Sequence, residues 1–333
     1  MTIKEALERI IGGGDLTREE AEQVMSFLML GEVHHGVVGG FLVGMQVKGI
    51  TGEELAGLAS GLRRHAVQYD FGMGSLVDTC GTGGGRATFN MSTGAAILAA
   101  ACGAKVAKHG NRAVTSFCGS VDVLEEMGVP VEGSLEEQRK RLMETGLTFL
   151  YAPRHHPAVR HVAPVRKALG VRTFFNLLGP LANPAGAKRQ LVGVFDLKMM
   201  DAVSEALLIL GVEHAFVVHG VDGMDEVTPC ADTEYREIKG GTISSGRWSP
   251  GDFGMEALPE SALDQGEGIA ENAAILREAL SDSGSLRSAA LVPNTAVTLV
   301  LAGVAADIAS GADLARAAVA SGAADRLLIR LAE

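Results

Sequence analysis

The sequence has few cysteines, and their spacing excludes the usual cysteine-based sites. Its 333 residues include only four, which are Cys80, Cys102, Cys118 and Cys230. No two of them have the C-x-x-C spacing that is typical of zinc ribbons and of dithiol redox motifs. We therefore expect reduced, mostly buried thiols, as in a protein of the reducing cytoplasm.

Long apolar runs and an excess of positive charge are lacking as well. No uninterrupted apolar stretch reaches the roughly 20 residues that span a bilayer, and the amphipathic start MTIKEALERII has no signal-peptide core. The net charge of −11 makes general nucleic-acid binding a poor hypothesis. A local anion site stays possible, because backbone N–H groups and one or two cations suffice for it. We expect a cytoplasmic protein that binds neither membranes nor nucleic acid.

What the sequence has in quantity is aliphatic side chains and glycine. Hydrophobic residues make up 47% and aromatic residues only 5%, and there are 43 glycines. The length exceeds that of a typical single domain, which predicts one large and one smaller domain. Residues 1–66 show only helical patterns. Within them Thr17 and Thr51, each followed three residues later by Glu, form capping boxes.

From residue 75 onward, short apolar runs alternate with helical stretches. The candidate strands are 76–78, 105–107, 147–150, 191–195 and 215–218. This alternation predicts an α/β domain with a mainly parallel central sheet, spanning residues 70–333. Residues 155–184 hold several prolines and are expected to be rich in loops, and 230–260 to form an excursion or a small antiparallel piece. From residue 294 on, the Ala-rich chain is expected to be mostly helical.

A glycine-rich turn follows the first candidate strand. Residues 78–85 read DTCGTGGG, and Asn90-Met91-Ser92-Thr93 then opens a helical pattern. Glycines let the backbone approach a ligand, and a helix N-terminus adds free N–H groups and a positive dipole end. The segment predicts a phosphate-binding loop, and an ordinary strand–turn–helix connection is the alternative.

A dense polar run follows the second candidate strand. Lys108-His109-Gly110-Asn111-Arg112 places four functional side chains around one glycine, at a strand end where α/β sheets bind ligands. Lys108 can neutralise a phosphate and Asn111 can position a polar group. For His109 taken alone, a structural role is as plausible as a functional one.

Three further features are candidates for binding. Asp225 and Glu226 follow the candidate strand 215–218, and adjacent carboxylates suit Mg²⁺, which binds one or two of them plus substrate phosphates. A solvated acidic loop is the alternative. Ser116 and Ser120, with a glycine between them, are candidates to wrap a phosphate. Arg166 and Arg172, in the proline-containing segment, are candidates to hold a carboxylate, and a surface ion pair is the alternative for either one.

In this order, the motifs resemble the anthranilate phosphoribosyltransferase family. They are GTGG, NMST, KHGNR, GS-x-DVLE, PVRKALG-x-RTFFNLLGPLANP and HG-x-DG-x-DE. The resemblance covers nearly the whole chain, and KHGNR with NLLGPLANP is its most specific part. It implies a small helical domain beside a large α/β domain, with the active site in the cleft between them. A helical segment at about 160–190 would return to the small domain, through which a homodimer would form.

The resemblance also implies a glycosyltransferase of tryptophan biosynthesis, with phosphoribosyl pyrophosphate and anthranilate as substrates and Mg²⁺ as the metal. The donor would be held by Gly81, Thr82, Gly83, Gly84, Thr88, Asn90, Ser92, Thr93 and Lys108, with Ser116 and Ser120 closing around its diphosphate. Mg²⁺ would be held by Ser92, Asp225 and Glu226. Anthranilate would face Gly81, His109, Gly110, Asn111 and Arg166, with Arg166 on its carboxylate. Lys108 and Arg166 would act by positioning and electrostatics, without a dedicated general base.

One departure from the family pattern concerns the metal. The family loop usually continues GTGG with Asp, whereas here Gly85 follows directly and the loop to Asn90 is one residue shorter. We expect greater reliance on Asp225 and Glu226, and an altered magnesium optimum.

Two other functions compete with this interpretation. A pyrimidine nucleoside phosphorylase-like enzyme would use free phosphate, and KHGNR together with the Asp-Glu pair speaks against it. A non-catalytic nucleic-acid-binding paralogue would need a basic groove and decayed substrate motifs. The negative net charge of the chain counts against this function.

Overall fold

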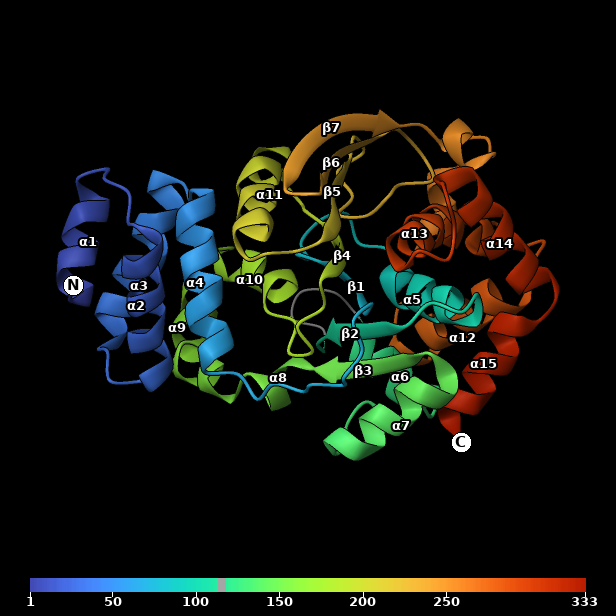
Figure 1. Cartoon of the computed structure of the whole chain (residues 1–333), viewed down its shortest axis with the longest axis horizontal. Coiled ribbons are helices and arrows are strands. Elements are labelled where there is room, and N and C mark those ends of the chain that lie inside the picture. Colours follow the sequence, from blue (N-terminus) through green and yellow to red (C-terminus); the bar gives the residue numbers. More distant parts are fainter. Residues whose placement is uncertain (113–117) are drawn as a thin grey trace.

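The chain forms a bundle of helices beside a twisted sheet that has helices on both faces (Figure 1). The computed structural model describes residues 1–112 and 118–333. The two ends of the chain lie far apart, with the N-terminus in the bundle and the C-terminus beyond the opposite face of the sheet. This arrangement matches the predicted fold class, a small helical part and a larger α/β part.

The N-terminal helices are α1 (Ile3–Ile11), α2 (Arg18–Leu30), α3 (His35–Lys48) and α4 (Gly52–Arg64). The predicted capping boxes are present. Thr17 accepts a hydrogen bond from the Glu20 N–H at 3.3 Å, and Thr51 accepts one from the Glu54 N–H at 3.2 Å. These caps satisfy N–H groups that the first turn of a helix leaves without an internal partner.

Seven strands form one sheet in the order β3-β2-β1-β4-β5-β6-β7. They are β1 (Val77–Gly81), β2 (Val106–Gly110), β3 (Leu147–Tyr151), β4 (Arg189–Gly193), β5 (His214–Gly220), β6 (Thr233–Lys239) and β7 (Thr242–Trp248). Strands β1 to β5 are parallel, whereas β6 and β7 form an antiparallel hairpin that extends the same sheet. The predicted parallel strands and the antiparallel excursion are both confirmed.

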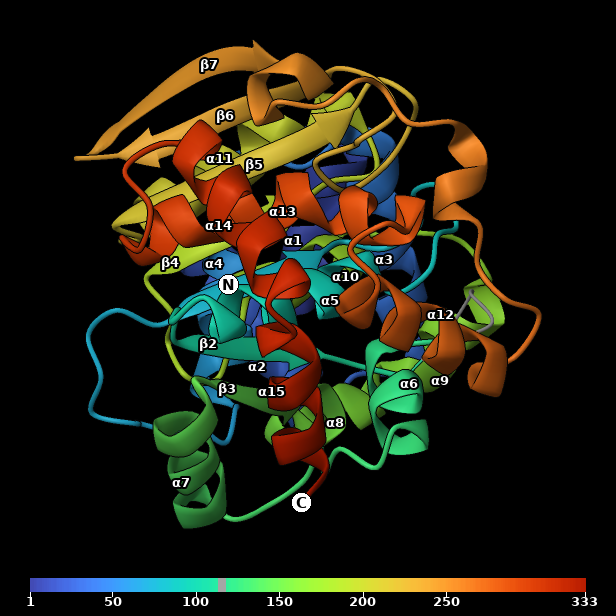
Figure 2. The ribbon, with the colours of Figure 1, turned by 90° about the vertical axis from the view of Figure 1, so that its right-hand side faces the viewer.

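Helices cover both faces of the sheet, which explains the continuous apolar runs of the strands. Leu191 belongs to the hydrophobic core on one face, and its neighbour Val192 to the core on the other. One face carries α5 (Met91–Ala101), α12 (Ile269–Ser281), α13 (Leu286–Ala302), α14 (Ile308–Ala320) and α15 (Ala323–Ala332), which lie in front of the sheet in Figure 2. The other face carries α10 (Phe175–Leu181) and α11 (Met200–Ile209). Helices α6 (Ser120–Glu126) and α7 (Leu135–Thr145) lie near β3.

The expectation of a loop-rich segment at 155–184 was wrong. The chain there forms α8 (Ala152–His155), the 3-10 helix η1 (Pro157–His161), α9 (Ala163–Leu169) and α10. Two of its four prolines start helices, because Pro157 and Pro164 occupy first-turn positions where no N–H donor is needed. Val165 and Phe174 pack into the core that also holds the N-terminal helices.

The remaining short elements are the 3-10 helices η2 (Leu197–Met199), η3 (Pro250–Phe253) and η4 (Glu260–Leu263). Among the described residues, no single helix is long and apolar enough to cross a membrane. Helices α12 and α13 meet such a test only as a pair, and they are bent by 74° relative to each other.

Candidate active site

The candidate residues gather where the parallel strands end. Strands β1, β2 and β4 finish at Gly81, Gly110 and Gly193, and Gly81 pairs directly with Gly193 in the sheet. Because these strands run in one direction, their loops emerge at a single edge. The glycine turn, the polar run after β2 and the acidic loop after β5 are thereby brought together.

Asp225 lies inside the glycine turn. Its Oδ2 accepts a hydrogen bond from the Gly83 N–H at 2.8 Å. A Cβ on Gly81 or Gly85 would stand 2.6 Å or 2.5 Å from the Asp225 carboxylate oxygens, and one on Gly193 only 1.7 Å from the Asp225 carbonyl oxygen. Glycine is therefore required at these positions to admit the acidic loop.

Some hydrogen-bonding groups of the glycine turn already have partners within the protein. The Thr82 N–H donates to the Gly193 carbonyl at 2.8 Å, and the Thr82 hydroxyl accepts from the Phe195 N–H at 3.2 Å. Thr82 therefore anchors the turn to β4. The Gly83 N–H becomes available to a ligand only when the Asp225 carboxylate turns away, so Asp225 and a phosphate compete for that amide.

Glu226 faces a narrow space between the strand ends and helix α5. Ser92, Thr79, Gly81 and Asn294 also line this space. Burial raises the pKa of Glu226 to about 8, and the adjacent Asp225 charge contributes to that rise. Burial also raises the pKa of Asp225. Two neighbouring buried carboxylates are costly without a cation.

Asn294 holds this acidic loop in place from helix α13. Its side chain accepts from the Val227 N–H and donates to the Val227 carbonyl, both at 3.0 Å. The paired bonds fix the backbone directly after Glu226. The carboxylates are thus presented by a loop that a buried helix secures.

Lys108 is the buried cation of the site. Its side chain is only 3% exposed, and its ammonium donates to the Thr79 carbonyl. Asp78, also buried, accepts from the His109 N–H at 3.0 Å. Burial raises the pKa of Asp78, and the charge of Lys108 opposes that rise. The charge of Lys108 opposes the rise in the pKa of Glu226 in the same way, so Lys108 interacts with both carboxyl groups.

His109 is buried and neutral. Its Nδ1 lies 3.0 Å from the Gly179 carbonyl of α10, which requires that Nδ1 carry the proton. Burial lowers the pKa of His109 to about 3, and the neighbouring His156 contributes. The Nε2 atom is buried without a hydrogen-bond partner among the described residues. It is left as an acceptor for an N–H donor.

A second buried histidine lies beside it. The rings of His156 and His109 have centroids 5.1 Å apart, and His156 Nε2 lies 3.0 Å from the Ala182 carbonyl. Burial lowers the pKa of His156 to about 4. Sequence reasoning missed His156, and the only signal for it was the His-His pair before a proline.

The lowered pKa of His156 predicts that the protein loses stability at acidic pH. Its folded-state pKa lies below its ordinary value of 6.5, so the stabilisation is complete above pH 6.5 and is lost as pH falls toward 4. At pH 5 the loss amounts to about 2 kcal/mol. His156→Gln keeps an N–H donor for Ala182 but cannot titrate. Urea unfolding at pH 7 and pH 5 should show a correspondingly smaller loss in this variant.

The matched control for this prediction is His35→Gln, because His35 is exposed on α3. It should keep the wild-type dependence of stability on pH. A His156→Gln variant that loses as much stability as the wild type between the two pH values would show that His156 is protonated in the folded protein.

The start of α5 is left without a side-chain cap. Asn90 occupies the N-cap position but makes no capping bond. Its Nδ2 donates instead to the Cys118 carbonyl at 3.1 Å, and its Oδ1 is buried without a partner among the described residues. Asn90 therefore does not cap the first turn, and the Ser92 N–H instead bonds to the Glu226 carboxyl group, which opposes the rise in its pKa. Thr93 is buried, and Thr88 is half-buried just before the buried Phe89.

The residues after β2 lie at the open edge. Asn111 is exposed, and its carbonyl accepts from the Ser120 hydroxyl at 3.1 Å. A Cβ on Gly110 would meet that hydroxyl at 2.5 Å, so Gly110 allows Ser120 to approach. The candidate Ser116 lies outside the described residues.

The two arginines considered from the 160–190 segment differ in their contacts. Arg166 on α9 lies over the ring of Phe175 in α10, 5.0 Å from its centroid, and burial lowers its pKa. Arg172, the other arginine considered from the sequence as a carboxylate ligand, stacks over Phe195 and donates to the Gly84 carbonyl. The segment thus contacts both the glycine turn and, through Gly179, His109.

The candidate protein ligands suit a metal ion that also binds a substrate. Within residues 1–112 and 118–333, no cluster of three or more His, Cys, Asp and Glu side chains could hold a metal by itself. Asp225 and Glu226 supply two carboxylates, and Ser92 a hydroxyl on the wall of the same space. Mg²⁺ commonly binds one or two carboxylates together with substrate phosphates.

Comparison with known proteins gives a consistent result. The model of the glycosyl transferase family helical bundle domain matches residues 4–66, and that of the glycosyl transferase family a/b domain matches residues 73–325. The anthranilate phosphoribosyltransferase of Myxococcus xanthus is 44% identical over 335 residues, which cover 100% of this chain and 99% of the relative.

Solved structures agree with the sequence comparison. The crystal structure of anthranilate phosphoribosyltransferase from Thermus thermophilus matches with a TM-score of 0.90 and 41% identity, covering 98% of each chain. The Saccharomyces cerevisiae enzyme, solved in complex with PRPP and Mg, matches with a TM-score of 0.88 and 27% identity. That match covers 99% of this chain and 96% of the yeast chain.

Proposed function

The chain belongs to the anthranilate phosphoribosyltransferase family, and on that premise we propose that it transfers the phosphoribosyl group of phosphoribosyl pyrophosphate to the amine of anthranilate. The products are N-(5-phosphoribosyl)anthranilate and diphosphate, in a step of tryptophan biosynthesis. The observation that carries the proposal is the convergence of the glycine turn, Lys108 and the carboxylates of Asp225 and Glu226 on one edge of the sheet.

Asp225, Glu226 and Ser92 are the residues that would hold Mg²⁺. The fit rests on the two buried neighbouring carboxylates, whose pKa values burial raises. The metal would neutralise negative charge on the leaving diphosphate. Rotation of the Asp225 carboxylate toward a cation would also free the Gly83 N–H for the donor's phosphate.

The donor would lie along the glycine turn and the start of α5. Its ligands would be Gly81, Thr82, Gly83, Gly84, Thr88, Asn90, Ser92, Thr93 and Lys108, joined by Ser116 and Ser120. As the bond between the ribose carbon and the diphosphate breaks, negative charge grows on the leaving group. The ammonium of Lys108 and the uncapped N–H groups of α5 would stabilise that charge.

Anthranilate would lie next to His109, between the end of β2 and the 160–190 segment. The lone pair on His109 Nε2 would accept a hydrogen bond from the amine and orient the nitrogen toward the ribose carbon. Gly81, Gly110 and Asn111 would border the ring, and Arg166 would pair with the carboxylate. An aryl amine is neutral at pH 7, so positioning suffices and no general base is required.

The test is a fluorescence assay of anthranilate consumption. Loss of anthranilate that requires both the diphosphate donor and Mg²⁺ supports the proposal. Turnover of thymidine with free phosphate, and none of anthranilate, would instead point to a nucleoside phosphorylase. Salt-sensitive DNA binding at physiological ionic strength without turnover would point to a nucleic-acid-binding paralogue.

We further propose that the shortened glycine loop changes the response to magnesium. Gly85 packs directly against the Asp225 carboxylate, so an acidic residue inserted after Gly84 would bring a third carboxylate toward the same cation. The insertion should shift the magnesium concentration that gives half-maximal activity. A titration of initial rate against Mg²⁺ measures this, and superimposable curves for the variant and the wild type would refute the idea.

The domain division and the oligomer are also proposals. Residues 1–66, with the segment at about 160–190, would form the small domain, and residues 70–333 the large one. A homodimer through the helical domain is supported by exposed apolar side chains, because Ile11 and Val47 are 74% and 82% exposed and Val43 lies one turn before Val47. The free thiols of Cys80, Cys102 and Cys230 support a place in the cytoplasm.

The dimer proposal predicts the effect of a charge on α3. Val47→Glu should shift the protein from dimer to monomer, because an interface cannot bury an unpaired carboxylate without a large cost. Light scattering after size exclusion reports the mass. Val67→Glu is the matched control, since Val67 is 47% exposed but lies outside the four helices, and it should remain dimeric. Equal masses for wild type and Val47→Glu would contradict the proposed interface.

A further inference from the structure

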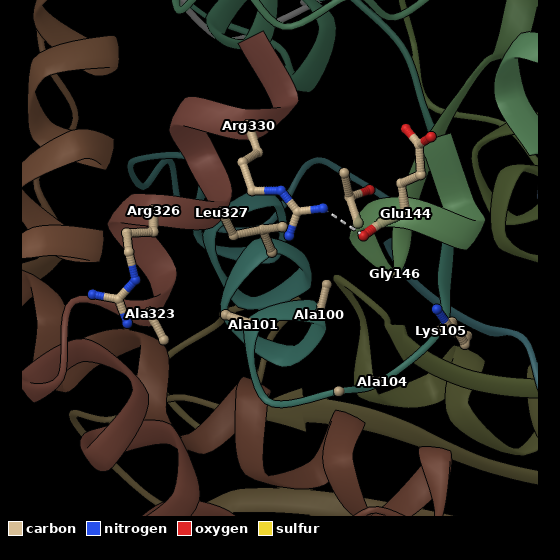
Figure 3. Close-up of a pocket in the computed structure, with 12 residues that line it drawn as sticks. Ala100, Ala101, Ala104, Lys105, Glu144, Gly146, Ala323, Arg326, Leu327 and Arg330 are labelled. Atoms are coloured by element: carbon tan, nitrogen blue, oxygen red, sulfur yellow. Dashed lines mark hydrogen bonds between the residues drawn. The ribbon is translucent and has the colours of Figure 1, made fainter. Parts of the chain in front are cut away.

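A second cavity lies at the opposite end of the sheet. Its walls come from the last turn of α5, the turn between α7 and β3, and one side of α15 from Ala323 to Arg330 (Figure 3). Its volume is about 370 Å³. That volume is within the range of small-molecule sites. Lys105 precedes β2, whereas Lys108 belongs to it, so the groove and the active site lie toward opposite ends of the same strand.

The charge of this groove differs from that of the whole chain. Lys105, Arg326 and Arg330 line it together with a single carboxylate, that of Glu144. The protein carries a net charge of −11, so an excess of cations in one cavity is unusual for it. A local positive potential attracts anions even on an acidic protein.

The three cations have no carboxylate partner within 4 Å among the described residues. They bond to backbone carbonyls instead. Arg330 donates to the Glu144 carbonyl at 2.7 Å, Arg326 to the Ser321 carbonyl at 2.9 Å, and Lys105 to the carbonyls of residues 142 and 143 at 3.3 and 3.4 Å. Figure 3 shows Arg330 and Lys105 approaching the turn before β3 from two sides, with Arg326 at the far rim.

These hydrogen bonds fix the positions of the three cations and leave other N–H donors of each arginine available to a ligand. A guanidinium has five N–H donors, and one bond to a carbonyl leaves four of them for a ligand. The accepting carbonyls lie at the ends of α7 and α14, whose partial negative charge compensates the cations only in part. Between the cations the wall is apolar, formed by Ala100, Ala104 and Leu327.

We propose that this groove binds a small metabolite that carries an oxyanion, as a phosphate or carboxylate, and an apolar part. The anion pairs with Arg330, and Lys105 and Arg326 add positive charge from the other walls of the groove. The apolar part lies on the alanine and leucine side chains. Helix α5 links the two ends of the sheet, because its first turn lies at the proposed donor site and its last turn at this groove, about 16 Å apart.

Equilibrium dialysis of the full chain with labelled inorganic phosphate, and separately with labelled citrate, tests the proposal. The variant Arg326→Ala/Arg330→Ala should lose one site per chain or bind there at least about tenfold more weakly. The control Arg277→Ala/Lys198→Ala removes two exposed cations elsewhere and should bind as the wild type does. Comparing the two anions distinguishes a phosphate from a carboxylate ligand.

The variant Glu144→Gln is expected to increase the affinity for anions. A misfolded protein would not show such an increase. Removing the only carboxylate of the groove should tighten anion binding about two- to fivefold. The proposal is overturned if the double arginine variant binds both anions with wild-type number and affinity, or if Glu144→Gln leaves the affinity unchanged.

Discussion

Replacing Lys108 by alanine should lower kcat/KM for phosphoribosyl pyrophosphate by about 10²- to 10³-fold, the usual effect of removing one electrostatic stabiliser of a developing anion. Lys108 is a buried cation that interacts with Asp78 and Glu226, and its ammonium donates to the Thr79 carbonyl. The KM for anthranilate should change little. Steady-state kinetics with each substrate varied in turn measures the difference.

Loss of Lys108 also leaves Asp78 buried without its cation, which threatens folding. The double variant Lys108→Ala/Asp78→Asn removes that unpaired charge and should recover stability but not donor use. Lys188→Ala is the control, because Lys188 is exposed just before β4 and bonds only to the Gly211 carbonyl. A folded Lys108 variant that keeps wild-type kcat/KM for the donor would remove Lys108 from the mechanism.

Replacing Arg166 by alanine should impair the use of anthranilate rather than of the donor. Its guanidinium is partly buried over Phe175 and pairs with no carboxylate among the described residues. Burial lowers its pKa, as expected for a cation that awaits an anionic partner. Two charge-assisted hydrogen bonds to a carboxylate predict a fall in kcat/KM for anthranilate of roughly 100-fold.

An acceptor without the carboxylate sharpens this test. Aniline cannot bond to Arg166, so the wild type and Arg166→Ala should use it at similar low rates. Lys167→Ala, at the exposed neighbouring position, should leave the preference for anthranilate unchanged. If Arg166→Ala discriminates against aniline as strongly as the wild type does, another group recognises the carboxylate. Identical kinetic defects in the Lys108 and Arg166 variants would show that the two roles are wrongly assigned.

The segment at 155–184 shows where local patterns mislead. Its prolines suggested loops, yet Pro157 and Pro164 occupy helix starts and Pro180 lies inside α10. A proline is compatible with a loop and with a first helical turn alike. Packing of Val165 and Phe174 against the N-terminal helices decided between them.

The sequence by itself determined the local features of this protein. Capping boxes at Thr17 and Thr51, apolar runs buried on both faces, and glycine at tight turns depend on neighbours a few residues away, and each can be read directly. The motifs likewise indicated the family, because they are short and contiguous.

Only the tertiary structure decided which groups meet across the chain. Asp225 accepts the Gly83 amide over a separation of 142 residues, His156 lies against His109, and Arg330 joins Lys105 around the second groove. Burial, which raises the pKa of Glu226 to about 8 and lowers that of His109 to about 3, depends on every element packed around those side chains. Such contacts have no local signature, because they arise when the sheet order and the helix packing place distant segments side by side.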